Sequence, residues 1–350
     1  MPFISAVSTI DFPHKATQQE VKVQAREMFA TNFPLVERLI DVFDNAGIET
    51  RNFCKPLSYY SAPNSFEERN KEYIRCAVEY SSKAIEECTI LAGVSAKDIT
   101  DIIVVSTTGL ATPSIDALLI NKLKLNPRIK RMPVWGLGCA GGVSGIAKAD
   151  VVANANPDAI VLLVAIELCS LTIIKNDYSK SNFIGSSLFS DGVAACIIKG
   201  DHHGKDGQVS LVGSASELYY HSLDMMGWDF QDKGFKVIFS KDIPGFINCH
   251  IKKDILEFLG GHGLTLKDIK NFIFHPGGRK VLQAYSDALD VKGDFLKKTR
   301  ETMSDYGNMS SATVLYVLKK FTEDGFERGY GLMLAMGPGF SSEMVLLKKL

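Results

Sequence analysis

The sequence of 350 residues lacks an excess of charge of either sign. It has 39 lysine and arginine residues against 40 aspartate and glutamate residues, which gives a net charge of −1. A nucleic-acid-binding protein needs a basic excess or a strong basic stripe, and neither is visible. We therefore expect no nucleic-acid partner.

The sequence also lacks paired cysteines, a membrane-spanning run and a signal sequence. Its seven cysteines include no C-x-x-C pair, which disfavours a disulfide framework or a metal site and favours reduced thiols in a cytoplasm. The most apolar stretch, 159–174, is about 16 residues long and contains Glu167, so it is too short and too polar for insertion into a membrane. The start, 1–15, has no basic region before Asp11 and is not a signal peptide.

What the sequence does have is an alternation of apolar runs and helical patterns, in a composition of 46% hydrophobic and 23% charged residues. This balance is typical of a globular protein with two domains or one duplicated domain. The alternation predicts an α/β fold with a mixed sheet covered on both faces. Strands are expected at 102–106, 134–137, 159–167, 271–275, 329–337 and 343–350. Helices are expected at 113–123, 140–152, 243–259, 276–289 and 310–322. The similar rhythm of the two halves suggests an internal duplication.

Cys139 lies in GLGCAGGVSG, on a turn between a predicted strand and a helix of small residues. The N-terminus of a helix carries a partial positive charge and unpaired N–H groups, which favour a thiolate. Glycines on both sides allow a sharp turn and close approach of a substrate. They equally suit a helix that packs tightly in a core, so a purely structural cysteine is the alternative.

Two polar residues lie at comparable junctions in the last third of the chain. His275 ends a predicted strand before Pro-Gly-Gly, and Asn308 follows a glycine before a predicted helix. Taken alone, Asn308 could simply cap that helix. Together, Cys139, His275 and Asn308 form a set that suits acyl transfer: the thiolate attacks a carbonyl, and the imidazole and amide stabilise an oxyanion. The set also suits Claisen chemistry, in which an enolate formed by decarboxylation attacks the acylated cysteine.

The flanks of these three residues resemble the signatures of type III polyketide synthases, the chalcone synthase superfamily. The motifs are GCAGG around Cys139, HPGGRKVL at His275 and GNMSSATVL at Asn308. The resemblance implies a thiolase-like fold, which is a duplicated five-layered αβαβα architecture with mixed sheets. The N-terminal half, 1–210, would carry the cysteine, and the C-terminal half, 211–350, the histidine and asparagine. It also implies a homodimer that uses acyl-CoA and malonyl-CoA as substrates and needs no cofactor.

The same resemblance implies roles for individual residues. Cys139 holds the starter and the growing chain, while His275 and Asn308 bind the thioester carbonyl during decarboxylation and condensation. Phe189, in GSSLFSDG, matches a gatekeeper phenylalanine between the CoA tunnel and the cavity. Other cavity-lining positions fall on Thr107, Glu167, Cys169, Thr172, Gly185 and Ser310. Thr112, in LATPS, matches the residue that the family offers to the neighbouring subunit's cavity.

Some positions depart from the plant enzymes of this family. Val237 stands at the second gatekeeper phenylalanine, and Trp228 replaces a cavity glycine. The basic residues that hold CoA phosphates in plants meet the acidic stretch 41–47, so that CoA binding falls to other basic residues: Arg38, Lys55 or Arg279.

Three stretches indicate a branch within the family. ELCSLT, TGLATPSID and MGWDF resemble the bacterial synthases that convert fatty acyl-CoA starters to alkylpyrones or alkylresorcinols. We therefore expect an acyltransferase with such a product. The alternative within the fold is a ketoacyl-ACP synthase III-like enzyme, although that group has an H-Q-x-N type signature where this chain has HPGGRK. A further alternative is a Cys-His-Asn hydrolase of papain type, but the residues that flank its cysteine differ from those around Cys139.

Overall fold

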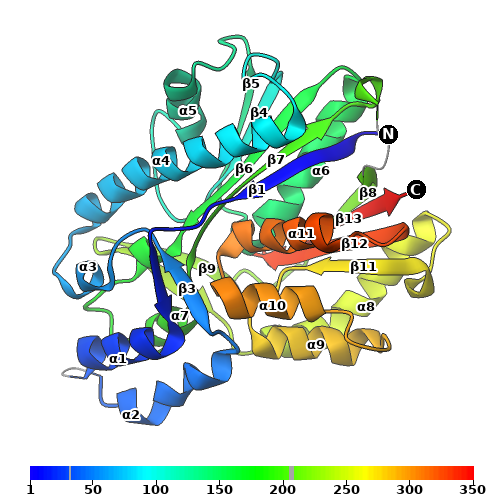
Figure 1. Ribbon diagram of the computed structural model, residues 1–350. Helices are drawn as coiled ribbons and strands as arrows, with labels where there is room; N and C mark the ends of the chain where they lie inside the picture. The colour runs from blue at the N-terminus through cyan, green and yellow to red at the C-terminus, as the bar shows by residue number, and fades with distance from the viewer. Residues whose placement is uncertain (31–32, 205–208) are drawn as a thin grey trace.

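The computed structural model describes residues 1–30, 33–204 and 209–350, and a mixed β-sheet of nine strands runs through its centre (Figure 1). Across the sheet the strands follow the order β11, β12, β13, β8, β1, β7, β6, β4 and β5. Their bounds are β1 Phe3–Thr9, β4 Asp101–Val105, β5 Lys130–Val134, β6 Ile160–Leu168, β7 Asp191–Lys199, β8 Val209–Leu218, β11 Ile269–Phe274, β12 Gly329–Gly337 and β13 Ser341–Lys349. Two antiparallel pairs lie apart from it: β2 His14–Thr17 with β3 Thr50–Phe53, and β9 Met226–Gln231 with β10 Gly234–Phe239.

The two halves of the large sheet repeat one arrangement of four strands. In the N-terminal half β1 pairs antiparallel with β7, β7 antiparallel with β6, and β6 parallel with β4. In the C-terminal half β8, β13, β12 and β11 pair in the same order and the same directions. The halves join where Phe3 and Ile4 of β1 lie opposite Ser210 and Val209 of β8. The expected duplication is therefore visible in the topology. The division at residue 210 falls just inside β8 and stays a prediction.

Helices form the other three layers, which confirms the five-layered arrangement. α6 (Gly141–Ala155) and α11 (Thr313–Asp324) lie between the half-sheets, and α6 contacts β4 and β6 on one side and β12 and β13 on the other. α4 (Phe66–Ala92) covers the outer face of the N-terminal half-sheet, and α8 (Ile243–Gly261) and α9 (Arg279–Leu289) cover that of the C-terminal half. The other helices are α1 Gln18–Phe29, α2 Val36–Leu39, α3 Leu57–Ser61, α5 Ile115–Leu123, α7 Lys180–Leu188 and α10 Lys297–Tyr306.

Glycines allow the two central helical segments to approach closely. A Cβ atom on Gly142, in the first turn of α6, would lie 2.2 Å from the carbonyl oxygen of Ser311. Ser311 belongs to the short 3-10 turn Ser310–Ala312 that leads into α11. The small residues that follow Cys139 therefore have a packing role, as the structural alternative supposed, and the same packing brings Cys139 against the C-terminal half.

The strand predicted at 134–137 is wrong, because the chain forms β5 at Lys130–Val134 instead. β5 is the outer strand of the sheet, and its first four residues are exposed. An edge strand needs no apolar run and tolerates a proline such as Pro133, whose missing N–H faces no partner strand. The predicted helix 276–289 begins later than expected, at Arg279, since Gly277 with φ +61° belongs to the preceding loop.

The structure also bears on membrane insertion. Among the helices that the described residues form, none combines the length and the hydropathy that crossing a bilayer requires.

Candidate active site

Cys139 lies at the point where the chain enters the central helical layer. It belongs to the 3-10 turn Gly138–Ala140, which continues directly into α6. Gly138, with φ +46°, makes the turn possible, and its N–H donates to Thr107 Oγ1 over 3.1 Å. The Cys139 thiol is buried and lies 3.7 Å from the hydroxyl oxygen of Ser310. The predicted strand-to-helix turn is therefore present, with the thiol facing residues of the other half.

His275 and Asn308 line one cavity together with Cys139. His275 directly follows β11, and its backbone N–H donates to the carbonyl oxygen of Leu334 over 2.8 Å. Asn308 follows α10; its Nδ2 donates to the Gly277 carbonyl, and its Oδ1 accepts from the Ser310 N–H, both over 2.8 Å. These bonds fix the amide so that one N–H of Nδ2 is left for another acceptor. The structure thus brings the three predicted catalytic residues together.

The imidazole of His275 is buried without a partner. Neither ring nitrogen has a hydrogen-bond acceptor or donor within the described part of the chain. Buried polar groups in folded proteins almost always have such a partner. A histidine that lines a cavity in this state is suited to hydrogen-bond an atom of a bound substrate.

Burial determines the protonation of Cys139 and His275. Burial raises the pKa of the Cys139 thiol to about 12, with a smaller rise from Glu167 and an opposing effect of the Ser310 hydroxyl. Burial also lowers the pKa of His275 to about 3. The free site therefore holds a neutral thiol and a neutral imidazole. This differs from the thiolate expected at a helix N-terminus, because desolvation outweighs the helix dipole here.

A second small cavity, of about 40 Å³, meets Cys139 from the side of the β9–β10 pair. Trp228 on β9 lies opposite Val237 on β10, and the Trp228 indole N–H donates to the carbonyl oxygen of Thr107 over 3.0 Å. Most of the predicted cavity residues line it: Thr107, Cys169, Phe189, Trp228, Val237 and Ser310. Others that line it were missed: Thr108, Met226, Phe239 and Pro338. The stretches TGLATPSID and MGWDF contain Thr108 and Met226, but no role was assigned to either residue.

Comparison with protein-family models matches both halves of the chain. The model of chalcone and stilbene synthases, N-terminal domain, matches residues 56–202, and the model of their C-terminal domain matches residues 211–350. The chain belongs to the chalcone and stilbene synthase family. Both matches are to this family, which favours it over the ketoacyl-ACP synthase III-like alternative.

Relatives and solved structures place the protein among bacterial type III polyketide synthases. The chain is 42% identical to a putative chalcone synthase of Bacillus subtilis over 99% of its length and 98% of that protein. It is 34% identical to the 1,3,6,8-tetrahydroxynaphthalene synthase of Streptomyces peucetius, over 99% and 92%. The crystal structure of the corresponding synthase of Streptomyces coelicolor, a bacterial type III polyketide synthase, superposes with a TM-score of 0.93 at 31% identity, covering 99% of both chains. The protein is therefore a type III polyketide synthase, an acyltransferase with the thiolase-like fold.

Three predicted cavity residues of this synthase lie outside the walls of the two cavities at Cys139. Glu167 is fully buried on β6, where it accepts hydrogen bonds from the Ser311 hydroxyl and the Thr107 N–H. Burial raises its pKa to about 7. Gly185 on α7 borders Phe189 and Val237, since a Cβ atom on this glycine would lie 3.5 and 3.6 Å from their side chains. Thr172 lines a further small cavity that shares Thr108 with the cavity at Cys139.

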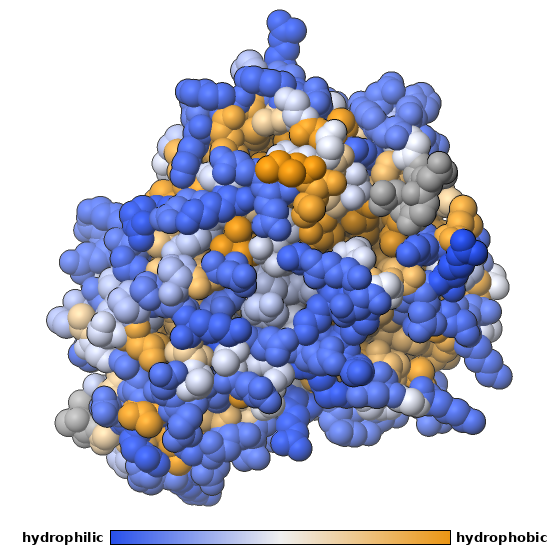
Figure 2. Space-filling model, viewed as in Figure 1, coloured by the Kyte–Doolittle hydropathy of each residue, from blue (hydrophilic) through white to orange (hydrophobic). Residues whose placement is uncertain are grey.

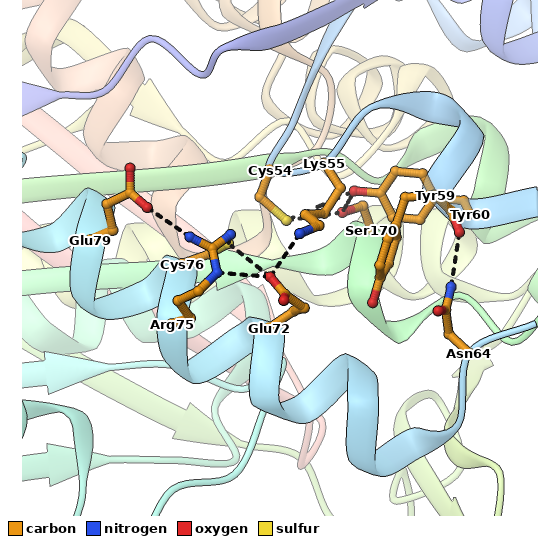
Figure 3. Close-up of polar contacts among 10 residues, drawn as sticks. All are labelled: Cys54, Lys55, Tyr59, Tyr60, Asn64, Glu72, Arg75, Cys76, Glu79 and Ser170. Carbon is orange, nitrogen blue, oxygen red and sulfur yellow. Dashed lines mark hydrogen bonds and ion pairs between the residues drawn. The ribbon is translucent and has the colours of Figure 1, made fainter. Parts of the chain in front are cut away.

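The remaining predicted residues are not brought to Cys139. Thr112 is exposed on the loop between β4 and α5, as its proposed place at a neighbouring subunit requires. Arg38 on α2 is exposed, and Arg279 is exposed at the start of α9, two residues after Gly277 of the His275 cavity. Lys55 pairs with Glu72 over 2.9 Å, beside Arg75 and Glu79 (Figure 3). CoA contacts of Arg38, Lys55 and Arg279 stay predictions.

We expect His275→Ala and Asn308→Ala each to lower the rate of malonyl-CoA decarboxylation by about 10²–10³, equivalent to about 2.7–4 kcal/mol, because each removes a donor to an oxygen that gains negative charge. Chromatography of the acetyl-CoA formed from malonyl-CoA measures this rate. His250→Ala, an exposed histidine on α8, is the matched control and should keep the parental rate. A parental rate in Asn308→Ala would leave this residue only its role in the turn before α11.

Proposed function

We propose that the protein transfers a starter acyl group from acyl-CoA to Cys139 Sγ and extends it with malonyl units by decarboxylative Claisen condensation. The observation that supports this most directly is the single cavity that Cys139, His275 and Asn308 line together. A thiol, an imidazole and an amide supply all the groups that the steps below require, so we propose that no metal ion or cofactor takes part.

The first step loads the starter. The neutral imidazole of His275 accepts the Cys139 proton as the sulfur attacks the thioester carbonyl, and the resulting imidazolium gives the proton to the departing CoA sulfur. The free N–H of Asn308 Nδ2 and the imidazolium both donate to the carbonyl oxygen as it becomes negative. The thioester on Cys139 then forms without a free thiolate in the resting site.

The second step extends the chain. Malonyl-CoA loses carbon dioxide, and the electrons of the broken C–C bond form an enolate, whose oxygen accepts hydrogen bonds from His275 and Asn308. The enolate carbon attacks the acyl carbonyl on Cys139, a new C–C bond forms, and the cysteine sulfur leaves as a thiolate, which takes a proton from water to become the neutral thiol of the resting site again. The extended chain is then on CoA and can return to Cys139, so that the cycle repeats before ring closure.

The proposed starter is a fatty acyl-CoA and the proposed product an alkylpyrone or alkylresorcinol. In support, the walls that lead away from Cys139 are narrow and carry small or apolar side chains, among them Thr107, Cys169 and Val237. Thr108 also borders a further small cavity, which Phe235 and Thr172 line. Each methylene of an acyl chain that is buried in such a cavity contributes about 0.8 kcal/mol. Two similar proteins are named for other products, the 1,3,6,8-tetrahydroxynaphthalene synthase of Streptomyces peucetius and the phloroglucinol synthase of Pseudomonas fluorescens, so product analysis across starters decides this point.

We expect Cys169→Phe to shift the preferred starter towards shorter acyl chains, because the ring would fill the path beyond Cys139, and to leave malonyl-CoA decarboxylation nearly unchanged. Mass spectrometry of products from a series of acyl-CoA starters with malonyl-CoA gives the chain-length profile. Cys249→Phe, at the exposed cysteine on α8, should keep the parental profile. An unchanged profile in Cys169→Phe, or a parental preference for aromatic starters, would contradict the fatty acyl proposal.

We also propose that the protein is a homodimer that associates along β5. The edge of β5 has no partner strand in the sheet, and such an edge is a template for a second copy. Exposed apolar side chains lie around it, including Leu110, Met132, Trp135 and Val151. Figure 2 shows hydrophobic surface in the upper part of the view, where Figure 1 places β4 and β5. The exposed Thr112 follows β4 and could then reach the partner.

We also propose a cytoplasmic location. All seven cysteines are free, which fits this proposal.

We expect Met132→Asp to shift the protein from dimer to monomer, because the carboxylate would be buried unpaired at the interface. Sedimentation velocity at matched protein concentrations measures the two species. Leu256→Asp, at an exposed leucine on α8 in the other half, should leave the dimer intact. A monomeric parent protein, or a fully dimeric Met132→Asp variant, would exclude this interface.

A further inference from the structure

A fully buried arginine lies behind the active site and takes no part in the steps above. Arg51 is on β3, which lies beside α10 (Figure 1), and its side chain has no exposed surface. Asp191 acts on its charge from a distance, but no carboxylate in the described part of the chain forms an ion pair with it. A buried charge is costly unless other polar groups compensate it. What compensates Arg51 indicates what it does.

The partners of Arg51 are carbonyl groups at the C-terminal end of α7. Its Nη1 donates to the carbonyl oxygens of Ser186 over 2.7 Å and of Phe189 over 2.9 Å. Gln18 Nε2 donates to the carbonyl between them, that of Ser187, over 2.8 Å. Carbonyls at the end of a helix lack partners within the helix and carry partial negative charge, which a cation stabilises. Arg51 therefore caps the end of α7.

The segment that Arg51 caps also holds Asn308. The N–H of Ser190 donates to the Asn308 carbonyl over 2.8 Å, and the N–H of Asn308 donates to the Leu188 carbonyl over 3.0 Å. Phe189, which lies between those two residues and lines the cavity at Cys139, forms a β-bridge with Asn308. One short stretch of backbone thus places both a cavity wall and the catalytic amide.

β3 contacts residues 188–190 at a second point and also packs against the loop that carries Asn308. Asn52, next to Arg51, exchanges two hydrogen bonds with the Ser190 hydroxyl, over 2.9 and 3.0 Å. A Cβ on Gly307, which precedes Asn308 with φ +73°, would lie 3.0 Å from Arg51 Cγ. The arginine stem therefore packs against the residue before Asn308, while its guanidinium anchors the strand-like segment on the other side. Two of its nitrogens, Nε and Nη2, have no hydrogen-bond partner among the described residues.

We infer that Arg51 is a positioning residue for the condensation chemistry: by capping α7 it fixes residues 188–190, and through them the direction in which the Asn308 amide donates to substrate. The inference rests on the proposed role of Asn308 in decarboxylation. A merely structural role would lower the stability of the whole protein without acting specifically through Asn308.

We expect Arg51→Met to lower kcat for malonyl-CoA decarboxylation by between about 10- and 100-fold, as a misplacement of about 1 Å does, with KM changed by no more than about twofold. Arg51→Lys keeps the charge on a shorter side chain and should recover part of the loss. The matched control is Asn271→Ala. Asn271 is also buried and donates to backbone carbonyls, those of Glu327 and Tyr330, which hold no catalytic residue. Its loss should lower Tm and leave kcat within about twofold.

A double variant separates positioning from stability. If Arg51 acts through Asn308, Arg51→Met should cause no further loss of decarboxylation in an Asn308→Ala background, so the two losses are not additive. Losses that multiply, or a folded Arg51→Met with parental kcat, would overturn the inference while leaving the proposed function intact. A parental rate in Asn308→Ala alone would overturn both the inference and the proposed role of Asn308 in decarboxylation. If Arg51→Met does not fold, Ser190→Ala, which removes only the link to Asn52, takes its place in the same cycle with the same two outcomes.

Discussion

The close contact between the first turn of α6 and the turn Ser310–Ala312 is the constraint on which the site depends. The contact requires Gly142, because any side chain there would collide with the Ser311 carbonyl. It seats Cys139, from the N-terminal half, against Ser310 and the loop of Asn308, from the C-terminal half. Both cavities at Cys139 are therefore lined by residues of the two halves.

The same burial that forms the cavity controls its chemistry. In the free site the thiol and the imidazole are both neutral, since desolvation raises the pKa of one and lowers that of the other. Proton transfer between them then becomes favourable only as a thioester carbonyl begins to accept charge. A resting thiolate is not required, and a buried thiol is protected from adventitious oxidation and alkylation. Burial also matters for Arg51, because this buried cation at the end of α7 keeps the Asn308 amide in place without entering the cavity.

Where the signal is local, the sequence predicted the elements and the three residues that line one cavity. Cys139 is recognisable from the glycines that its turn requires, and His275 from its place at the end of an apolar strand. The edge strand β5 was misplaced, since an exposed edge needs no apolar run. The sequence predicted a thiolate at Cys139 from the helix N-terminus alone. It could not show how deeply the thiol is buried, because that burial depends on contacts with the other half. Arg51 gave no signal, since its partners, Ser186 and Phe189, lie more than 130 residues along the chain.

The central claim is that Cys139 carries the acyl chain, and trapping the acyl-enzyme tests it most directly. The protein is incubated with an acyl-CoA starter in the absence of malonyl-CoA, quenched in acid and digested, and the peptides are analysed by mass spectrometry. The account predicts one acyl group on the peptide that contains Cys139, lost in Cys139→Ala and formed more slowly in His275→Ala. Acylation of another cysteine, or an equal acyl load in Cys139→Ala, would contradict it.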